Sequence, residues 1–227
     1  MRLTLRDGRL LRDMALSHVL SRDQVIALRY FNSVTRANTR LRELRSLDLV
    51  RRIETPFFGQ ALYSVGPKAK EVLGERIGLI VAGRTGSPRF LQHALSVTFV
   101  RIALINRGAT AWRFEQQLRS TFEYLGRTYE VRPDGMAIGS SGPIAIEVDL
   151  GHVAPTKFKA KLDAYEAFVR CGEAKRRWRH DSFKLLTITT GPLRASRLKR
   201  LVPRDCHYES AFMTFDQLGL PKVGSWS

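Results

Sequence analysis

The chain has 227 residues and a strong excess of basic side chains. Lys and Arg number 38 against 21 Asp and Glu, which gives a formal net charge of +17 and a pI near 10.7. This length suits one large domain or two small ones, and this charge favours a polyanion partner such as nucleic acid. The longest apolar run, 77–82, is too short to span a bilayer, and the first residues lack the apolar core of a signal peptide. We therefore expect a cytoplasmic protein with no membrane partner.

The first eighty residues predict three helices followed by a β-hairpin. Apolar side chains recur at helical spacing, and Ser21 and Ser33 are suited to cap the second and third helices. The expected helices cover 10–20, 23–31 and 34–47, and the expected strands cover 49–54 and 61–65. This order is typical of a winged helix-turn-helix domain.

One face of the expected third helix carries side chains suited to DNA, while Ala37, Leu41 and Leu44 fall on its apolar side. Basic, hydroxyl and amide side chains contact phosphates and base edges. We therefore predict that the helix and the hairpin bind double-stranded DNA through Arg36, Asn38, Thr39, Arg40, Arg42, Arg51 and Arg52. The alternative is a winged helix used for protein contact or dimerisation, with solvated arginines.

Gly, Ser and Pro in the stretch 79–88 predict a domain boundary. The expected domains are a winged helix over 1–80 and an α/β domain over 88–227. In the second domain the expected helices cover 90–106, 111–125, 156–170 and 193–201, and the expected strands cover 136–138, 144–146, 183–189 and 210–215. This pattern predicts an α+β or α/β fold, with a small mixed sheet flanked by helices.

A basic segment follows the helix at 156–170. Its cations surround Trp178, so the segment is suited to hold a phosphate backbone while the indole stacks on a base. The predicted contacts are Lys175, Arg176, Arg177 and Arg179. The alternative for each of these side chains is a solvated basic loop.

Several carboxylates are expected to approach one another in the second domain. Asp134 lies at a Pro-Asp-Gly corner, Glu147 and Asp149 share one face of a strand, and Glu115 falls on the apolar side of the helix expected at 111–125. Acids from separate elements bind Mg²⁺, which activates the water that attacks a phosphodiester, and a nearby lysine such as Lys161 offsets the developing charge.

The predicted metal ligands are therefore Asp134 and Glu147, and the predicted catalytic set adds Glu115 and Lys161. The alternative for Glu115 is a buried salt bridge with an arginine. The alternative for the whole cluster is a structural set of ion pairs, with Asp149 bonded to Lys or Arg.

Two motifs carry a resemblance to known families. Pro133-Asp134-Gly135 and then Glu147-Val148-Asp149 before a helix resemble the PD-(D/E)XK nuclease superfamily. With Gly151 after the strand and Lys161-Leu162-x-x-Tyr165 on the next helix, the layout more closely resembles the replication-relaxation family of plasmids and other mobile elements, over about residues 8–190. That resemblance implies a winged helix joined to a degenerate nuclease-like domain.

The chain departs from the nuclease pattern at Asp149, where the superfamily has a lysine. Either Lys161, or in second place Lys157, replaces that lysine, or the site does not cleave. The family resemblance implies a DNA-binding accessory protein of a mobile element. The alternatives are a Mg²⁺-dependent endonuclease or nickase, and a transcriptional regulator or assembly protein whose second domain forms a homodimer.

Overall fold

The computed structural model describes residues 2–74, 87–140 and 142–220. The chain divides into two compact units, one that ends at Ile102 and one that begins at Ala103. Over the described residues, helices and three separate sheets make up these units, which confirms the predicted mixed α/β class. The boundary predicted at 79–88 lies almost entirely outside the described residues.

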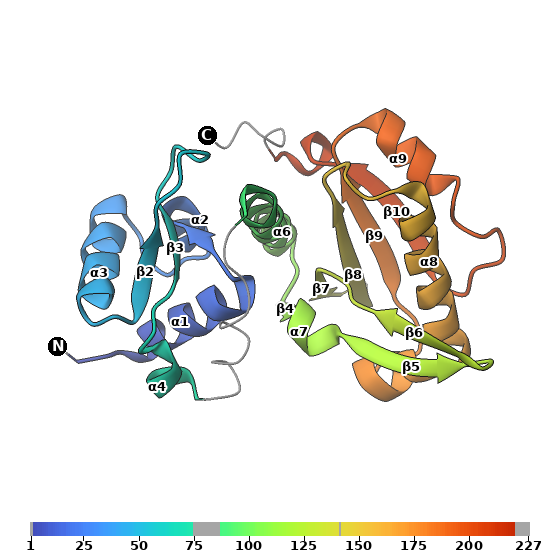
Figure 1. The fold of residues 1–227 in the computed structure, drawn as a ribbon, viewed down its shortest axis with the longest axis horizontal. Helices are drawn as coiled ribbons and strands as arrows, with labels where there is room; N and C mark the ends of the chain where they lie inside the picture. Colours follow the sequence, from blue (N-terminus) through green and yellow to red (C-terminus); the bar gives the residue numbers. More distant parts are fainter. Residues whose placement is uncertain (1, 75–86, 141, 221–227) are drawn as a thin grey trace. The chain divides into compact units, whose positions relative to one another are not determined.

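The first unit has the predicted order of three helices and a hairpin, with a short extra strand before the second helix. Its first elements are α1 (Leu5–Ser17), β1 (Leu20–Ser21), α2 (Arg22–Ala27), α3 (Val34–Ser46), β2 (Val50–Ile53), β3 (Leu62–Val65) and α4 (Ala69–Leu73) (Figure 1). The strands form an antiparallel sheet in the order β1-β3-β2. Ser21 and Ser33 accept hydrogen bonds from the backbone N–H groups of Gln24 and Arg36, which confirms both predicted caps.

The core of the first unit is built from the apolar sides of these helices. Ala37, Leu41 and Leu44 of α3 are buried, as their spacing predicts, against Leu10, Met14 and other apolar side chains. The helix α6 (Pro88–Asn106) belongs to this unit as far as Ile102. The buried Gln24 amide of α2 donates a 2.9 Å hydrogen bond to the Leu95 carbonyl of α6.

The second unit contains a mixed five-stranded sheet and a separate two-stranded ribbon. Its elements are β4 (Ala111–Phe114), α7 (Glu115–Leu118), β5 (Ser120–Tyr124), β6 (Arg127–Val131), β7 (Gly135–Gly139), β8 (Gly142–Asp149), α8 (Pro155–Arg170), the π-helix η1 (Ala174–Trp178), β9 (Lys184–Thr189), α9 (Pro192–Lys199), β10 (Glu209–Thr214) and the 3-10 turn η2 (Asp216–Leu218). The five strands follow the order β10-β9-β8-β7-β4, in which β8, β9 and β10 are parallel and β7 and β4 are antiparallel.

Helix α8 covers this sheet (Figure 1). Its apolar residues Phe158, Leu162, Tyr165 and Phe168 are buried in one cluster with side chains of β7, β8 and β9. Since side chains alternate across a strand, the same packing directs the polar residue Glu147 of β8 toward α8. The fold therefore brings the end of β8 and the middle of α8 together.

The prediction of one helix over 111–125 is wrong, because this segment forms β4, the short α7 and β5. Aromatic residues, which favour strands, occur at every second position in Trp112 and Phe114, and burial alternates over β5, where Phe122 is buried and Glu123 is exposed. Trp112 pairs with Ala137 on β7, and its indole covers the backbone of Gly135, where a Cβ atom would lie 2.0 Å from the ring. A local pattern was therefore overridden by pairing with a strand more than twenty residues away.

Among the described residues, no helix is both long enough and apolar enough to cross a membrane.

Candidate functional site

The outer face of α3 presents the predicted DNA-contacting side chains. Arg36, Asn38, Thr39 and Arg42 are exposed. Within the described ranges, neither Arg36 nor Arg42 forms an ion pair with an acid. The structure therefore places four members of the predicted set on one accessible helix surface.

Arg40 differs from these neighbours, because its guanidinium is already bound. It donates to both oxygens of the fully buried Asp7, at 2.9 and 2.5 Å, and to Glu43 at 2.6 Å. Burial raises the pKa of Asp7, but the hydrogen bonds from Arg40 and Thr4 outweigh burial and hold that pKa at about 2. Arg40 thus joins α3 to α1, and this geometry gives it a structural role.

The two hairpin arginines are exposed on β2. Arg51 donates a 2.8 Å hydrogen bond to the Ser64 hydroxyl of β3, and Arg52 lies 3.3 Å from Glu54. The Arg52–Glu54 pair lies at the surface, where an ion pair adds little stability and exchanges readily with another partner, whereas the Ser64 hydroxyl bound by Arg51 is buried.

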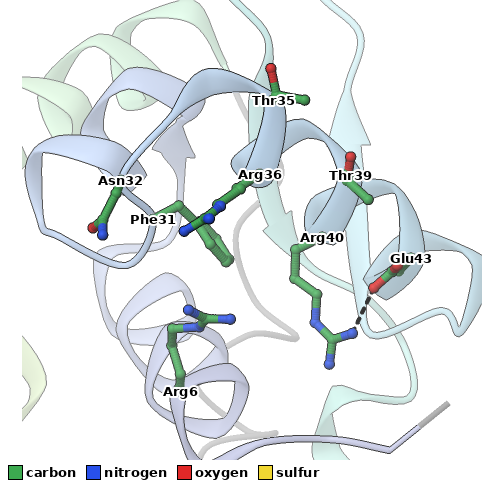
Figure 2. Close-up of a pocket in the computed structure, with 8 residues that line it drawn as sticks. All are labelled: Arg6, Phe31, Asn32, Thr35, Arg36, Thr39, Arg40 and Glu43. Atoms are coloured by element: carbon green, nitrogen blue, oxygen red, sulfur yellow. Dashed lines mark hydrogen bonds and ion pairs between the residues drawn. The ribbon is translucent and has the colours of Figure 1, made fainter.

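A pocket of about 390 Å³ opens beside α3 (Figure 2). Its lining consists of Arg6, Phe31, Asn32, Thr35, Arg36, Thr39, Arg40 and Glu43. The Arg6 guanidinium lies 4.8 Å from the centre of the Phe31 ring, a cation–π geometry. Sequence reasoning missed Arg6, because only the packing of α1 against α3 brings it beside the predicted residues.

In the second unit, Glu147 is the centre of a buried hydrogen-bonded group. One carboxylate oxygen accepts a short bond from the Lys161 ammonium, and the other accepts a 2.7 Å bond from the Tyr165 hydroxyl. Only 3% of Glu147 is exposed, whereas 42% of the Lys161 side chain is exposed. The predicted approach of Lys161 to Glu147 is therefore seen in the structure.

The charges of this group alter one another's titration. Burial raises the pKa of Glu147, the nearby charge of Asp134 adds to that rise, and Lys161 opposes it. Burial alone would lower the pKa of Lys161, but the Glu147 and Asp134 carboxylates raise it overall. Burial and the Glu147 charge also raise the pKa of Tyr165. The hydroxyl and the ammonium therefore stay protonated as donors.

The other two predicted acids have their own partners. Asp134 accepts a 2.7 Å hydrogen bond from the Val148 N–H on β8. Glu115 forms an ion pair with Arg132, as the salt-bridge alternative expected, although both side chains remain partly exposed. Arg132 also acts electrostatically on Lys161. Asp134, Glu147 and Lys161 thus interact with one another through charge. Glu115 instead binds Arg132.

The donor set fits a divalent metal poorly. Among the described residues, no group of three or more His, Cys, Asp or Glu side chains is placed to hold a metal ion. Both Glu147 oxygens already accept from protein donors, so an ion shared by Asp134 and Glu147 would compete with the Lys161 ammonium.

Asp149, at the position where the nuclease pattern that the sequence resembles has a lysine, is held in a structural ion pair. Its carboxylate is 3% exposed and accepts bonds from Arg194 at 2.8 and 3.1 Å and from the Thr189 hydroxyl at 2.9 Å. Lys157 is exposed. Of the two lysines considered as replacements, the structure places Lys161 against the carboxylate group.

The basic segment around η1 differs from its prediction in one respect. Trp178 is 1% exposed and donates to the Leu118 carbonyl at 3.1 Å, so its indole is a core side chain that cannot stack on a base. Arg176 and Arg177 both pair with Glu173, and Lys175 pairs with Asp181, while Arg179 is exposed.

These features define an α+β protein in which a basic helix-and-hairpin unit precedes a unit with a buried carboxylate–lysine group. A family model described as replication-relaxation matches residues 11–182. The chain belongs to the replication-relaxation family, as its motifs indicated, and this membership points to a function related to replication. No curated protein and no solved structure matches the chain.

Proposed function

We propose that this protein is a DNA-binding accessory factor for the replication of a plasmid or other mobile element. Its first unit acts as a winged helix that binds double-stranded DNA. The observation that carries the proposal is the exposed α3 face, where Arg36 and Arg42 have no acidic partner among the described residues. The net charge of +17 adds a long-range attraction for a polyanion.

The chemistry of this face suits a DNA groove. An α-helix fits the major groove, where arginine binds guanine and asparagine binds adenine through paired hydrogen bonds. Thr39 is able to donate to a phosphate or a base edge, and Arg51 and Arg52 on the hairpin are placed to bind flanking phosphates. In this proposal Arg40 supports the helix rather than binding DNA.

Replacing both Arg36 and Arg42 with Ala is expected to weaken duplex binding by about 30-fold or more at low salt, since each contact contributes about 1 kcal/mol or more. The slope of log affinity against log salt should also fall by about 1 to 2, because fewer counterions are released. Fluorescence anisotropy of a labelled duplex measures both quantities.

Lys70→Ala is the matched control, because Lys70 is an exposed cation of the same unit on α4. It should change affinity by about 2-fold or less. A wild-type protein that fails to bind duplex DNA at low salt, or whose binding does not respond to salt, would overturn the proposal.

A second candidate function is that of a metal-dependent DNA endonuclease or nickase using Glu115, Asp134, Glu147 and Lys161. The observation in its favour is the contact of Lys161 with Glu147, which supplies a lysine from the next helix in place of the one missing at position 149. A metal at Asp134 and Glu147 would supply the Lewis acid, and Lys161 would offset charge on the phosphate.

Supercoiled plasmid distinguishes the two candidates. We expect wild-type protein with Mg²⁺ or Mn²⁺ to nick plasmid no faster than Glu147→Ala protein, because Lys161 and Tyr165 occupy the Glu147 oxygens. The Glu147→Ala variant also controls for contaminating nucleases, and its duplex binding verifies that the first unit is folded. Nicking that depends on the metal and disappears in Glu147→Ala would favour the endonuclease instead.

A further inference from the structure

We infer that the pocket between α1 and α3 binds a phosphate group, and that Arg6 of α1 is its principal ligand together with Arg36. Neither the predicted DNA contacts nor the nuclease-like group includes Arg6. Where the phosphate belongs to the DNA backbone, the inference rests on the proposed DNA-binding function. The pocket extends the contact surface of the first unit from α3 to α1.

The charges that line the pocket favour an anion. Three arginines and one glutamate line it, which gives a net charge of +2. Glu43 and the buried Asp7 neutralise Arg40. Within the described ranges, Arg6 and Arg36 have no acidic partner, so their positive charges remain available to a ligand. Two such guanidiniums beside one pocket repel each other unless an anion lies between them.

The pocket is also arranged before any ligand arrives. Arg6 rests against the Phe31 ring, which is 4% exposed, so the stem and the guanidinium lose less freedom when they bind. Figure 2 shows Arg6 pointing from α1 toward this ring, and Arg36 lines the pocket from α3. A planar guanidinium forms paired hydrogen bonds with phosphate oxygens.

Neutral donors complete the lining. Thr35 and Thr39 carry hydroxyls, and Asn32 carries an amide at the turn before α3. The pocket also adjoins the first turn of a helix of 13 residues, whose positive end favours an anion. A phosphate held here would fix the position of α3 on the duplex without reading sequence, which is the usual role of backbone contacts.

Arg6→Gln in the full chain tests the site. We expect about a 5- to 10-fold loss of duplex affinity and a salt slope lower by about 1, with the same loss on duplexes of unrelated sequence. Arg12→Gln is the matched control, because Arg12 is exposed on the same helix and lies outside the pocket, and it should change affinity by about 2-fold or less. Circular dichroism verifies folding, and Arg6→Ala serves as the second variant if Arg6→Gln fails to fold.

Pyrophosphate distinguishes a pocket that binds free phosphate from one that binds the phosphates of the DNA backbone. We compare the melting temperature of each variant in pyrophosphate and in sodium chloride of equal ionic strength. If the wild type binds no duplex, but pyrophosphate stabilises it and not Arg6→Gln, the pocket binds free phosphate and the proposed DNA-binding function fails. If Arg6→Gln equals Arg12→Gln in both assays, the inference is overturned, and intact duplex binding leaves the proposed function standing.

Discussion

Replacing Lys161 with Met is expected to lower the free energy of unfolding of the second unit by about 3–5 kcal/mol, the usual cost of leaving one partner of a buried ion pair unpaired. Glu147 is almost fully buried, and its remaining hydrogen bond from Tyr165 is weaker than the charge-assisted bond it loses. Urea unfolding followed by tryptophan fluorescence in a Trp226→Phe background reports this unit, because Trp112 and the buried Trp178 are then the remaining tryptophans and both lie in it.

Replacing Glu147 should cost less stability than replacing its partner Lys161. In Glu147→Gln, the Lys161 ammonium reaches water, since 42% of its side chain is already exposed, and Tyr165 retains an amide oxygen as acceptor. We therefore expect a smaller loss, about 1–2 kcal/mol. The double variant Glu147→Gln/Lys161→Met should recover most of the stability that Lys161→Met loses, because no buried charge remains.

The decrease in the free energy of unfolding caused by Lys161→Met should also depend on pH. Without the ammonium, burial and the Asp134 charge raise the pKa of Glu147 further above its unfolded value. The folded state then binds more protons than the unfolded state, so stability falls as pH rises through the folded pKa and recovers below it. The deficit relative to wild type should therefore be largest near neutral pH and should shrink toward pH 5.

Lys159→Met provides a matched control on the same helix. Lys159 pairs with Asp163 four residues later, with both side chains about half exposed. An exposed helical pair contributes about 0.5 kcal/mol or less, so this variant should unfold almost like wild type. Equal losses in Lys159→Met and Lys161→Met would contradict the assignment of a buried charge to Glu147.

The first unit could be predicted from the sequence because its signals are local. Ser21 and Ser33 mark helix starts through hydrogen bonds that span three residues, and the apolar side of α3 follows a single period. The segment 111–125 could not be predicted in the same way. Its state depends on pairing with β7, whose register is set by residues such as Gly135 that lie far along the chain.

The candidate site was predictable in its members but not in their partners. Period two along β8 placed Glu147 and Asp149 on one face, yet the two carboxylates bind different helices, α8 and α9. That difference depends on how the helices pack on the sheet. The same limit applies to Arg40, whose partner Asp7 lies on another helix, 33 residues earlier. Charge and spacing along one helix do not show which cations are already bound.

Replacing Asp7 with Asn is the corresponding test in the first unit, and we expect it to lower the free energy of unfolding by about 2–4 kcal/mol. Asp7 is fully buried, and besides binding Arg40 it accepts hydrogen bonds from the backbone and hydroxyl of Thr4 at the start of α1. Hydrogen exchange of the α1 and α3 amides reports this unit alone.

The pH dependence has a definite sign. The pKa of Asp7 falls from its ordinary 3.8 to about 2, which corresponds to about 2 kcal/mol of stability. Because the folded pKa is the lower one, this contribution is fully present well above pH 4 and is lost as pH falls toward 2. Wild type and Asp7→Asn should therefore converge in acid and differ most at neutral pH.

Asp23→Asn is the control, since Asp23 also lies in the first turn of a helix but is exposed and, in the part of the chain that the structure describes, pairs only with Arg22. It should change stability by about 0.5 kcal/mol or less. If Asp7→Asn behaves like Asp23→Asn, the pair with Arg40 is not structural, and Arg40 returns to the set of predicted DNA contacts. If Asp7→Asn is destabilised as expected, a loss of the proposed DNA binding in Arg40→Ala reflects a loosened α3, and exposed residues such as Arg36 and Arg42 test the proposed DNA contact directly.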